Sequence, residues 1–276
     1  MGNDLIMKAP MDIYTTTAKS DRILLRSDAG GVATLTLNRP KQYNALSMEM
    51  IDALQAALDE VADDPSVRVV VIAANGMAFC PGHDLKEMLA NRTQEFVGGL
   101  FDKCCKAMMT ITRIPQPVIA RVHGIATAAG CQLVASCDLA VAASDAKFAT
   151  SGINFGLFCA TPGVAVSRNV SRKQAMEMLL TGDFIDAPTA LAWGLVNRVV
   201  PADKLDDAVR ELTDVLLSKP PAVLAAGKKF FYRQIEMDLE PAYKLASQVI
   251  THNMLGHDAL EGVGAFVEKR KPKWKT

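Results

Sequence analysis

Two loops rich in small residues contain the groups whose type and spacing could support chemistry. The first loop, NGMAFCPGHDLKEM over residues 75–88, passes through Pro81-Gly82. The second loop, HGIATAAGCQLVASCD over residues 123–138, enters a helical pattern through Ala128-Ala129-Gly130. Backbone N–H groups at a helix N-terminus favour an anion or a developing oxyanion, and small residues let a ligand approach the main chain. Both loops are candidate sites of this kind, although glycine and alanine before a helix are also ordinary turn chemistry.

Each loop follows a stretch that predicts a buried strand. Residues 67–73 (VRVVVIA) form a nearly continuous apolar run, and residues 117–122 (PVIARV) form another. Such runs are typical of parallel strands covered on both faces. Upstream, residues 32–38 (VATLTLN) predict a strand that ends before a proline, and Ser47 is placed to cap a helix with apolar residues at helical spacing. The alternation of strands and helices predicts an α/β architecture built from stacked ββα or βαβ units.

From Asp203 onward the strand signal ends. Four segments there have apolar residues at helical spacing and are separated by prolines or glycine: 203–219, 222–235, 241–255 and 257–271. The sequence therefore predicts three parts. They are an N-terminal extension over 1–22, an α/β core over 23–202 and a C-terminal helical region over 203–276.

Composition limits the possible partners and compartments. The 276 residues are 50% hydrophobic and 22% charged, and 30 basic residues balance 30 acidic ones, so no bulk positive field gathers nucleic acid or an anionic membrane. The six cysteines lack CxxC spacing, which favours buried reduced thiols and predicts no metal site. Residues 1–22 contain three aspartates and no apolar run long enough for export or for crossing a bilayer, so we expect a cytoplasmic protein.

Motifs along most of the chain resemble the enoyl-CoA hydratase/isomerase family, the crotonase superfamily. The resemblance extends from about residue 30 to 274, and its motifs follow the family's order. They are LNRPKQYNALS (37–47), AFCPGHDLKEM (78–88), residues 114–149, TPGVAVSR (161–168), WGLVNRVVP (193–201) and EGVGAFVEKRKPKW (261–274).

The resemblance implies a crotonase (ClpP-like) fold, which is a spiral of ββα units with a C-terminal helical trimerisation region. It implies a homotrimer or a dimer of trimers that binds an acyl-CoA thioester as substrate or ligand, with no separate cofactor. The activity implied is that of a lyase or isomerase of fatty acid metabolism. Matched residue by residue, the backbone N–H groups of His83 and Ala129 form an oxyanion hole for the thioester carbonyl.

The resemblance also assigns residues to CoA. Ala45, Leu85 and Lys86 are expected along the nucleotide and pantetheine arm. Phe266 and Lys269 are expected to reach the adenine and phosphates from an adjacent subunit. A lysine beside phosphate is electrostatically favourable, but a solvated helix face is the alternative interpretation of both lysines.

Two positions depart from the family pattern. Hydration of an enoyl-CoA needs one group that activates water and another that delivers a proton to the α-carbon, and the family's hydratases use two glutamates. The first glutamate position matches Gln132 and the second matches Gly152. An amide has no useful acidity and glycine has no side chain, so we expect two-glutamate hydration to be absent or very weak. A further position, where some family members have an acid, matches Ala160.

Other groups leave two alternatives to hydration open. His83 brings an imidazole to the first loop, so a thioesterase or isomerase using the oxyanion hole with His83 is one alternative, unless the ring only packs against the pocket. A non-catalytic acyl-CoA-binding oligomer is another. Cys131 and Cys159 lack an obvious activating base, and we interpret them as buried thiols.

Overall fold

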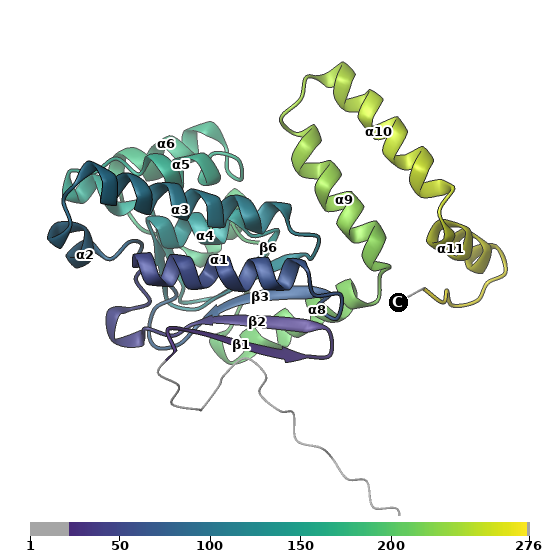
Figure 1. The fold of residues 1–276 in the computed structure, drawn as a ribbon, viewed down its shortest axis with the longest axis horizontal. Helices are drawn as coiled ribbons and strands as arrows, with labels where there is room; N and C mark the ends of the chain where they lie inside the picture. Colours follow the sequence, from purple (N-terminus) through teal and green to yellow (C-terminus); the bar gives the residue numbers. More distant parts are fainter. Residues whose placement is uncertain (1–21, 275–276) are drawn as a thin grey trace, which may run out of the picture.

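A six-stranded sheet forms the centre of the computed structural model, which describes residues 22–274 (Figure 1). Its strand order is β1-β2-β3-β4-β6-β9. β1 and β2 are antiparallel, and every later neighbouring pair is parallel. The strands are β1 (Leu24–Ala29), β2 (Val32–Leu37), β3 (Val69–Ala74), β4 (Val118–Val122), β6 (Leu139–Ala143) and β9 (Arg198–Val200).

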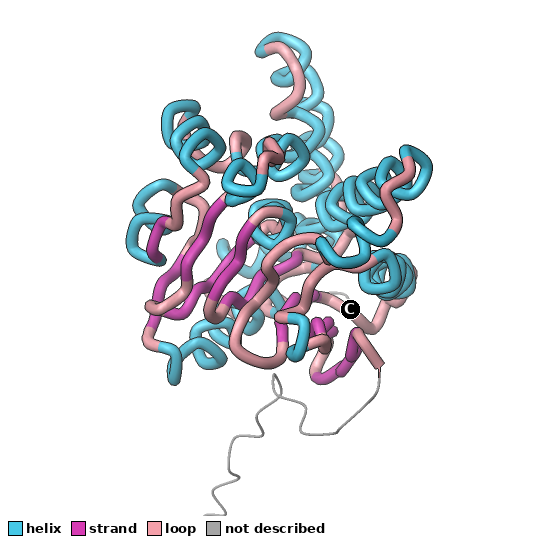
Figure 2. Tube along the Cα trace, turned by 90° about the vertical axis from the view of Figure 1, so that its left-hand side faces the viewer, coloured by secondary structure: helices cyan, strands magenta, loops and turns pink. Residues whose placement is uncertain are grey.

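Helices cover both faces of this sheet, as Figure 2 also shows. On one face, Val70 and Ile72 of β3 pack in the core that contains buried residues of α1 (Met48–Ala62) and α3 (Gln94–Arg113). On the other face, Val69 and Val71 pack with buried residues of α8 (Leu205–Leu217). Burial on both faces explains why the sequence of β3 is continuously apolar.

A second, three-stranded sheet lies beside the main one and supports the second candidate loop. Its strands are β5 (Ile125–Thr127), β7 (Lys147–Ala149) and β8 (Ile185–Asp186), in the order β5-β7-β8. β5 leads directly into α4 (Ala129–Ser136), all of whose residues are buried. The remaining helices of the core are α2 (Leu85–Ala90), α5 (Ala160–Val166), α6 (Arg172–Thr181) and α7 (Ala187–Trp193).

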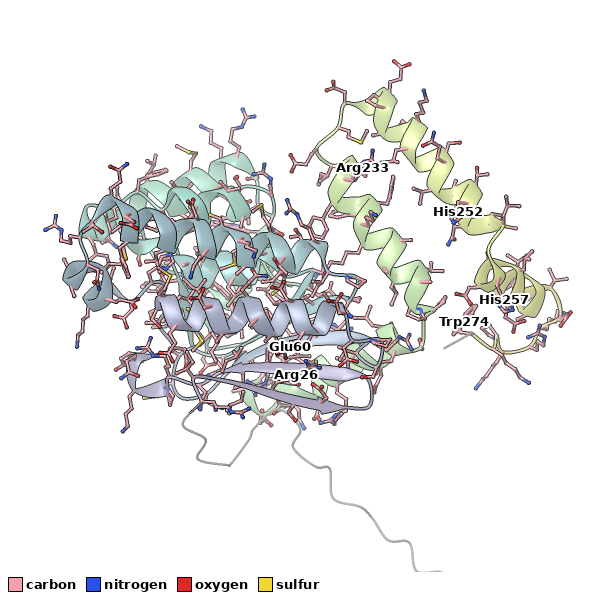
Figure 3. All side chains as sticks on the ribbon, viewed as in Figure 1. Arg26, Glu60, Arg233, His252, His257 and Trp274 are labelled. Atoms are coloured by element: carbon pink, nitrogen blue, oxygen red, sulfur yellow. The ribbon has the colours of Figure 1, made fainter. Side chains whose placement is uncertain are left out.

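The last three helices, which we call the C-terminal arm, extend away from the sheet (Figure 1). They are α9 (Pro221–Gln234), α10 (Leu239–Met254) and α11 (His257–Val267). Figure 3 shows His252 and His257 on the distal part of this arm, whereas Trp274 folds back and donates a 2.8 Å hydrogen bond to the Ser218 carbonyl. The predicted region 203–276 thus contains α8, which packs on the sheet, as well as the arm.

The arm is joined to the core by a buried ion pair. The Lys228 ammonium of α9 lies 2.6 Å from the Asp138 carboxylate and donates to the carbonyls of Ile111 and Gln116. Asp138 also accepts from the Tyr232 hydroxyl and from the Val118 N–H. Burial lowers the pKa of Lys228, with Asp138 opposing that shift.

Several sequence predictions of local structure are confirmed. Ser47 caps α1 by accepting from the Met50 N–H, and the predicted strands correspond to β2, β3 and β4. The four predicted C-terminal helices correspond to α8, α9, α10 and α11. The predicted N-terminal extension lies almost wholly outside the described residues. No helix within residues 22–274 is both long and apolar enough to cross a bilayer.

Candidate active site

The two candidate loops touch each other at glycines. Gly82 has φ +103°, and a Cβ on it would lie 2.9 Å from the Ala128 Cβ and 3.2 Å from the Ala129 nitrogen. A Cβ on Gly130 would collide with the Cys80 carbonyl oxygen. Only glycine fits these contacts without displacing main chain, so the small residues are needed for the close approach of the loops.

Each loop presents a backbone N–H that has no partner within residues 22–274. The Leu46 N–H donates to the Gly82 carbonyl, and the Leu46 carbonyl accepts from the Asp84 N–H. Because these two bonds flank His83 in a parallel bridge, the N–H of His83 faces away from Leu46. Ala129 is the first residue of α4, so its N–H lies in the turn where no helical acceptor exists. Neither N–H donates to another described group.

Ala128 connects β5 to α4 in an unusual conformation. Its φ of 49° and ψ of −121° are unfavourable for a residue with a Cβ, yet its N–H donates to the Ala149 carbonyl at 3.0 Å. Backbone strain of this kind costs about 1–3 kcal/mol and is characteristic of functional sites. The conformation lets Ala129 begin a helix directly after the strand.

The His83 ring is fixed in a defined tautomer. Its Nδ1 lies 3.4 Å from the Leu46 carbonyl oxygen, which only accepts hydrogen bonds, so Nδ1 is the protonated nitrogen. Phe101 of α3 packs edge-to-face on the ring with centroids 5.1 Å apart. Burial lowers the pKa of His83, while the Leu46 carbonyl opposes that shift. The ring is therefore neutral at pH 7, and its buried Nε2 has a lone pair without a partner among the described residues.

The two positions matched to the hydratase glutamates offer no acid or base. Gln132 of α4 is 4% exposed, and its amide oxygen has no hydrogen-bond partner in the described chain. Gly152 lies in a 3₁₀ turn, Ser151–Phe155, and donates its N–H to the Cys159 Sγ at 3.2 Å. Ala160 begins α5 and is exposed.

Three residues matched to CoA lie together at the first loop. Ala45 is buried, while Leu85 and Lys86 are exposed in the first turn of α2. Sequence reasoning missed the residue that joins them. Arg39 donates to the Ala45 carbonyl at 3.0 Å and to the carboxylate of Asp84 at 3.2 Å. Asp84 in turn caps α2, so Arg39 ties the Ala45 turn to this helix.

The other two residues matched to CoA are not part of this cluster. Phe266 is 84% exposed at the end of α11, and Lys269 follows that helix with φ 56°. α11 lies at the far end of the arm, on the opposite side of the molecule from α2 (Figure 1). A single chain therefore does not bring Phe266 and Lys269 to Lys86.

The remaining candidates have structural surroundings. Burial raises the pKa of the Cys131 thiol to about 12 and also raises the pKa of Cys159, which disfavours a thiolate nucleophile at either position. The Nε2 atom of His123 lies 2.8 Å from the Gly76 carbonyl oxygen. Asp138 belongs to the Lys228 ion pair described above.

Comparison with known proteins identifies the family of the chain. The sequence profile of the enoyl-CoA hydratase/isomerase family matches residues 27–276. The chain belongs to the enoyl-CoA hydratase/isomerase family. Its crotonase fold is confirmed by a crystal structure of enoyl-CoA hydratase from Mycobacterium smegmatis, which is 57% identical with a TM-score of 0.91 and covers 93% of this chain and 100% of that one.

Within this family, one named group recurs among the relatives. Enoyl-CoA hydratase domain-containing protein 3, mitochondrial, from Xenopus laevis is 48% identical over 244 residues, which is 88% of this chain and 83% of that protein. The crystal structure of the human domain-containing protein 3 is 44% identical with a TM-score of 0.89, and the match covers 92% of this chain and 100% of that one. The match covers most of the frog protein and the whole of the human crystal structure.

The comparisons correct the expected compartment. Relatives from frog, human, rat, mouse and zebrafish, at 42–48% identity, are all named as mitochondrial proteins. The prediction of a cytoplasmic protein is therefore wrong. The composition and the lack of a long apolar run in residues 1–22 are features that cytoplasmic and mitochondrial enzymes share, so those criteria could not separate the two compartments.

Proposed function

We propose that this family member binds acyl-CoA thioesters and holds the thioester carbonyl oxygen between the N–H groups of His83 and Ala129. The observation that supports this most directly is the contact between the two loops, each with an unpaired N–H. Two donors that converge on one oxygen stabilise an enolate-like charge, and loss of one such donor costs about 3–4 kcal/mol in comparable sites.

CoA is proposed to lie along Ala45, Leu85 and Lys86, with Phe266 and Lys269 supplied by an adjacent subunit of a homotrimer or dimer of trimers. The exposed apolar residues of the arm support this assembly. They include Leu239, Tyr243, Ile250, Leu255, Leu260 and Phe266. Exposed apolar surface on this scale is typical of a surface that is covered in an assembly.

The proposed site does not perform two-glutamate hydration. A buried amide at 132 cannot exchange a proton, and residue 152 contributes no side chain. The N–H groups remain available, because backbone donors do not depend on side-chain identity. Binding of the thioester and hydration of its double bond are thus separate properties in this chain.

The binding proposal is tested by comparing two ligands that differ at one oxygen. Isothermal calorimetry with butyryl-CoA and with S-butyl-CoA, the thioether that lacks the carbonyl oxygen, measures the contribution of the N–H pair. We expect the thioester to bind about tenfold or more tightly than the thioether, since each hydrogen bond contributes roughly 0.5–1.5 kcal/mol. Equal affinities would remove the basis for an oxyanion site.

A second candidate function is favoured by the tautomer of His83. With Nδ1 hydrogen-bonded to Leu46, Nε2 is the atom that accepts a proton, as a thioesterase or an isomerase would require. In thioester hydrolysis Nε2 would take a proton from water while the water oxygen bonds to the carbonyl carbon. The proton would then pass to the departing CoA thiolate.

This candidate predicts the outcome of His83→Ala. Turnover of saturated, enoyl and dienoyl thioesters should fall about 10²-fold or more, with CoA binding retained, because the N–H of residue 83 remains. Since the base must be neutral, turnover by the unsubstituted protein should be lost as pH falls through the lowered pKa of His83, below 6.5. A rise in Tm with acyl-CoA, without turnover of any thioester, is the result that a non-catalytic acyl-CoA-binding oligomer predicts instead.

A further inference from the structure

The place beside Gly152 is filled by other atoms of the chain. A Cβ on Gly152 would lie 2.7 Å from the Cys159 Sγ and 2.7 Å from the Leu157 carbonyl oxygen. Residue 152 is outside the positive-φ region that favours glycine, so its backbone would accept a side chain. The obstacle to a side chain at 152 is therefore contact with residues 157–159.

Cys159 lies against the second loop of the site. Its Sγ accepts the Gly152 N–H, and its proximity contributes to the raised pKa of Cys131, in the first turn of α4. The hydroxyl of Ser151, which precedes Gly152, lies 2.8 Å from the hydroxyl of Thr127, which precedes Ala128. The Cys159 side chain is thus adjacent to the segment that ends in the proposed Ala129 donor.

Two buried polar side chains in the same region have no partner among residues 22–274. They are the Gln132 amide oxygen, one residue after Cys131, and the Thr150 hydroxyl, two residues before Gly152. An unpaired buried polar atom costs about 1–3 kcal/mol, so each of these two atoms needs a hydrogen-bond partner from outside the chain. This observation, independent of Cys159, points to a ligand beside the α4 N-terminus.

We propose that the side chain of residue 159, rather than that of residue 152, occupies the position that the second glutamate carboxylate has in the family's hydratases. The inference rests on the proposed binding of acyl-CoA thioesters at these loops. Cys159 is accordingly a specificity-determining residue: its uncharged thiol lies where a hydratase of this family would present a carboxylate to the acyl group. Sequence matching assigns that role to Gly152, but the chain has no room for a longer side chain there.

The inference predicts which pair of substitutions creates a hydratase. In hydration the water oxygen bonds to C3 as one carboxylate takes its proton, the C2=C3 π bond breaks, and another carboxyl group delivers a proton to C2. Gln132→Glu with Cys159→Asp supplies both groups, because the new carboxylate at position 159 would lie where the thiol is now. Gln132→Glu with Gly152→Glu does not, because the second side chain cannot be accommodated.

Crotonyl-CoA hydration is measured for three double variants, with product identified by mass spectrometry. Gln132→Glu/Cys159→Asp should be faster by about 10²-fold than the isosteric control Gln132→Glu/Cys159→Asn. Gln132→Glu/Gly152→Glu should not exceed that control. A faster Gly152→Glu pair would overturn the inference, and so would a Cys159→Asp pair that binds the thioester but reacts no faster than the Cys159→Asn control.

Binding and packing are measured separately so that the two proposals can fail independently. If the unsubstituted protein binds no thioester, the proposed function fails. The position of Cys159 is then tested by Gly152→Ala in the unsubstituted chain and in Cys159→Ala. We expect Gly152→Ala to lower Tm by roughly 4 °C in the first and by less in the second, since the Sγ contact is gone. Equal shifts would contradict the filled position.

Discussion

Gly82→Ala is expected to abolish the preference for a thioester and to lower the free energy of unfolding by about 2–4 kcal/mol. Gly82 has φ +103°, and its new Cβ would meet the Ala128 Cβ at 2.9 Å and the Ala129 nitrogen at 3.2 Å. The two loops must separate to relieve these contacts. Separation moves the His83 and Ala129 N–H groups apart, so they can no longer share one oxygen.

Calorimetry with butyryl-CoA and S-butyl-CoA, together with urea unfolding, measures both effects of Gly82→Ala. Gly30→Ala is the matched control, since Gly30 has φ +58° in the β1–β2 turn and nothing lies within 4 Å of a Cβ there. We expect that control to lose about 1–2 kcal/mol of stability and to keep its ligand preference. A folded Gly82→Ala protein that still prefers the thioester would show that the loop contact does not position the donors.

Lys228→Met is expected to cost about 3–5 kcal/mol of stability, because it leaves a buried carboxylate without its cation. The Lys228 side chain is 7% exposed and lies 2.6 Å from Asp138. The carbonyls of Ile111 and Gln116 lose their donor as well. Because this pair joins α9 to the core, the C-terminal arm should also become more susceptible to proteolysis.

Urea unfolding and limited proteolysis measure the two effects of Lys228→Met. Lys229→Met is the control, since the neighbouring lysine is exposed and its loss should change stability by less than about 0.5 kcal/mol. Lys228→Met/Asp138→Asn should recover part of the loss, because no uncompensated charge remains. A loss for Lys228→Met no larger than that for Lys229→Met would mean that the ion pair does not hold the arm.

Local signals allowed much of the fold to be predicted from the sequence. The cap at Ser47 depends on residues close to it in the chain, and the continuous apolar run of β3 reflects its burial. Both features can be recognised from the sequence alone. The two candidate loops were also located, because glycine and alanine before a helix are a local pattern. The order of family motifs then indicated the fold that joins these elements.

Contacts between distant segments were not predictable in this way. Arg39 joins the nearby Ala45 to Asp84, which lies 45 residues after Arg39, and nothing in a single sequence specifies that pairing. Matching along the sequence assigned Gly152 to a lost glutamate, but only the fold places the Cys159 thiol against it. The tautomer of His83 depends in the same way on the carbonyl of Leu46, which is 37 residues away.

A single-turnover reaction tests the central claim most directly: the chain binds an enoyl thioester without hydrating it. Protein in excess is mixed with crotonyl-CoA, and bound ligand and product are followed in the same sample. We expect the thioester to be bound and to remain unsaturated over many seconds. Conversion to 3-hydroxybutyryl-CoA at about 1–10³ s⁻¹, the range typical of enzymes, would contradict this account.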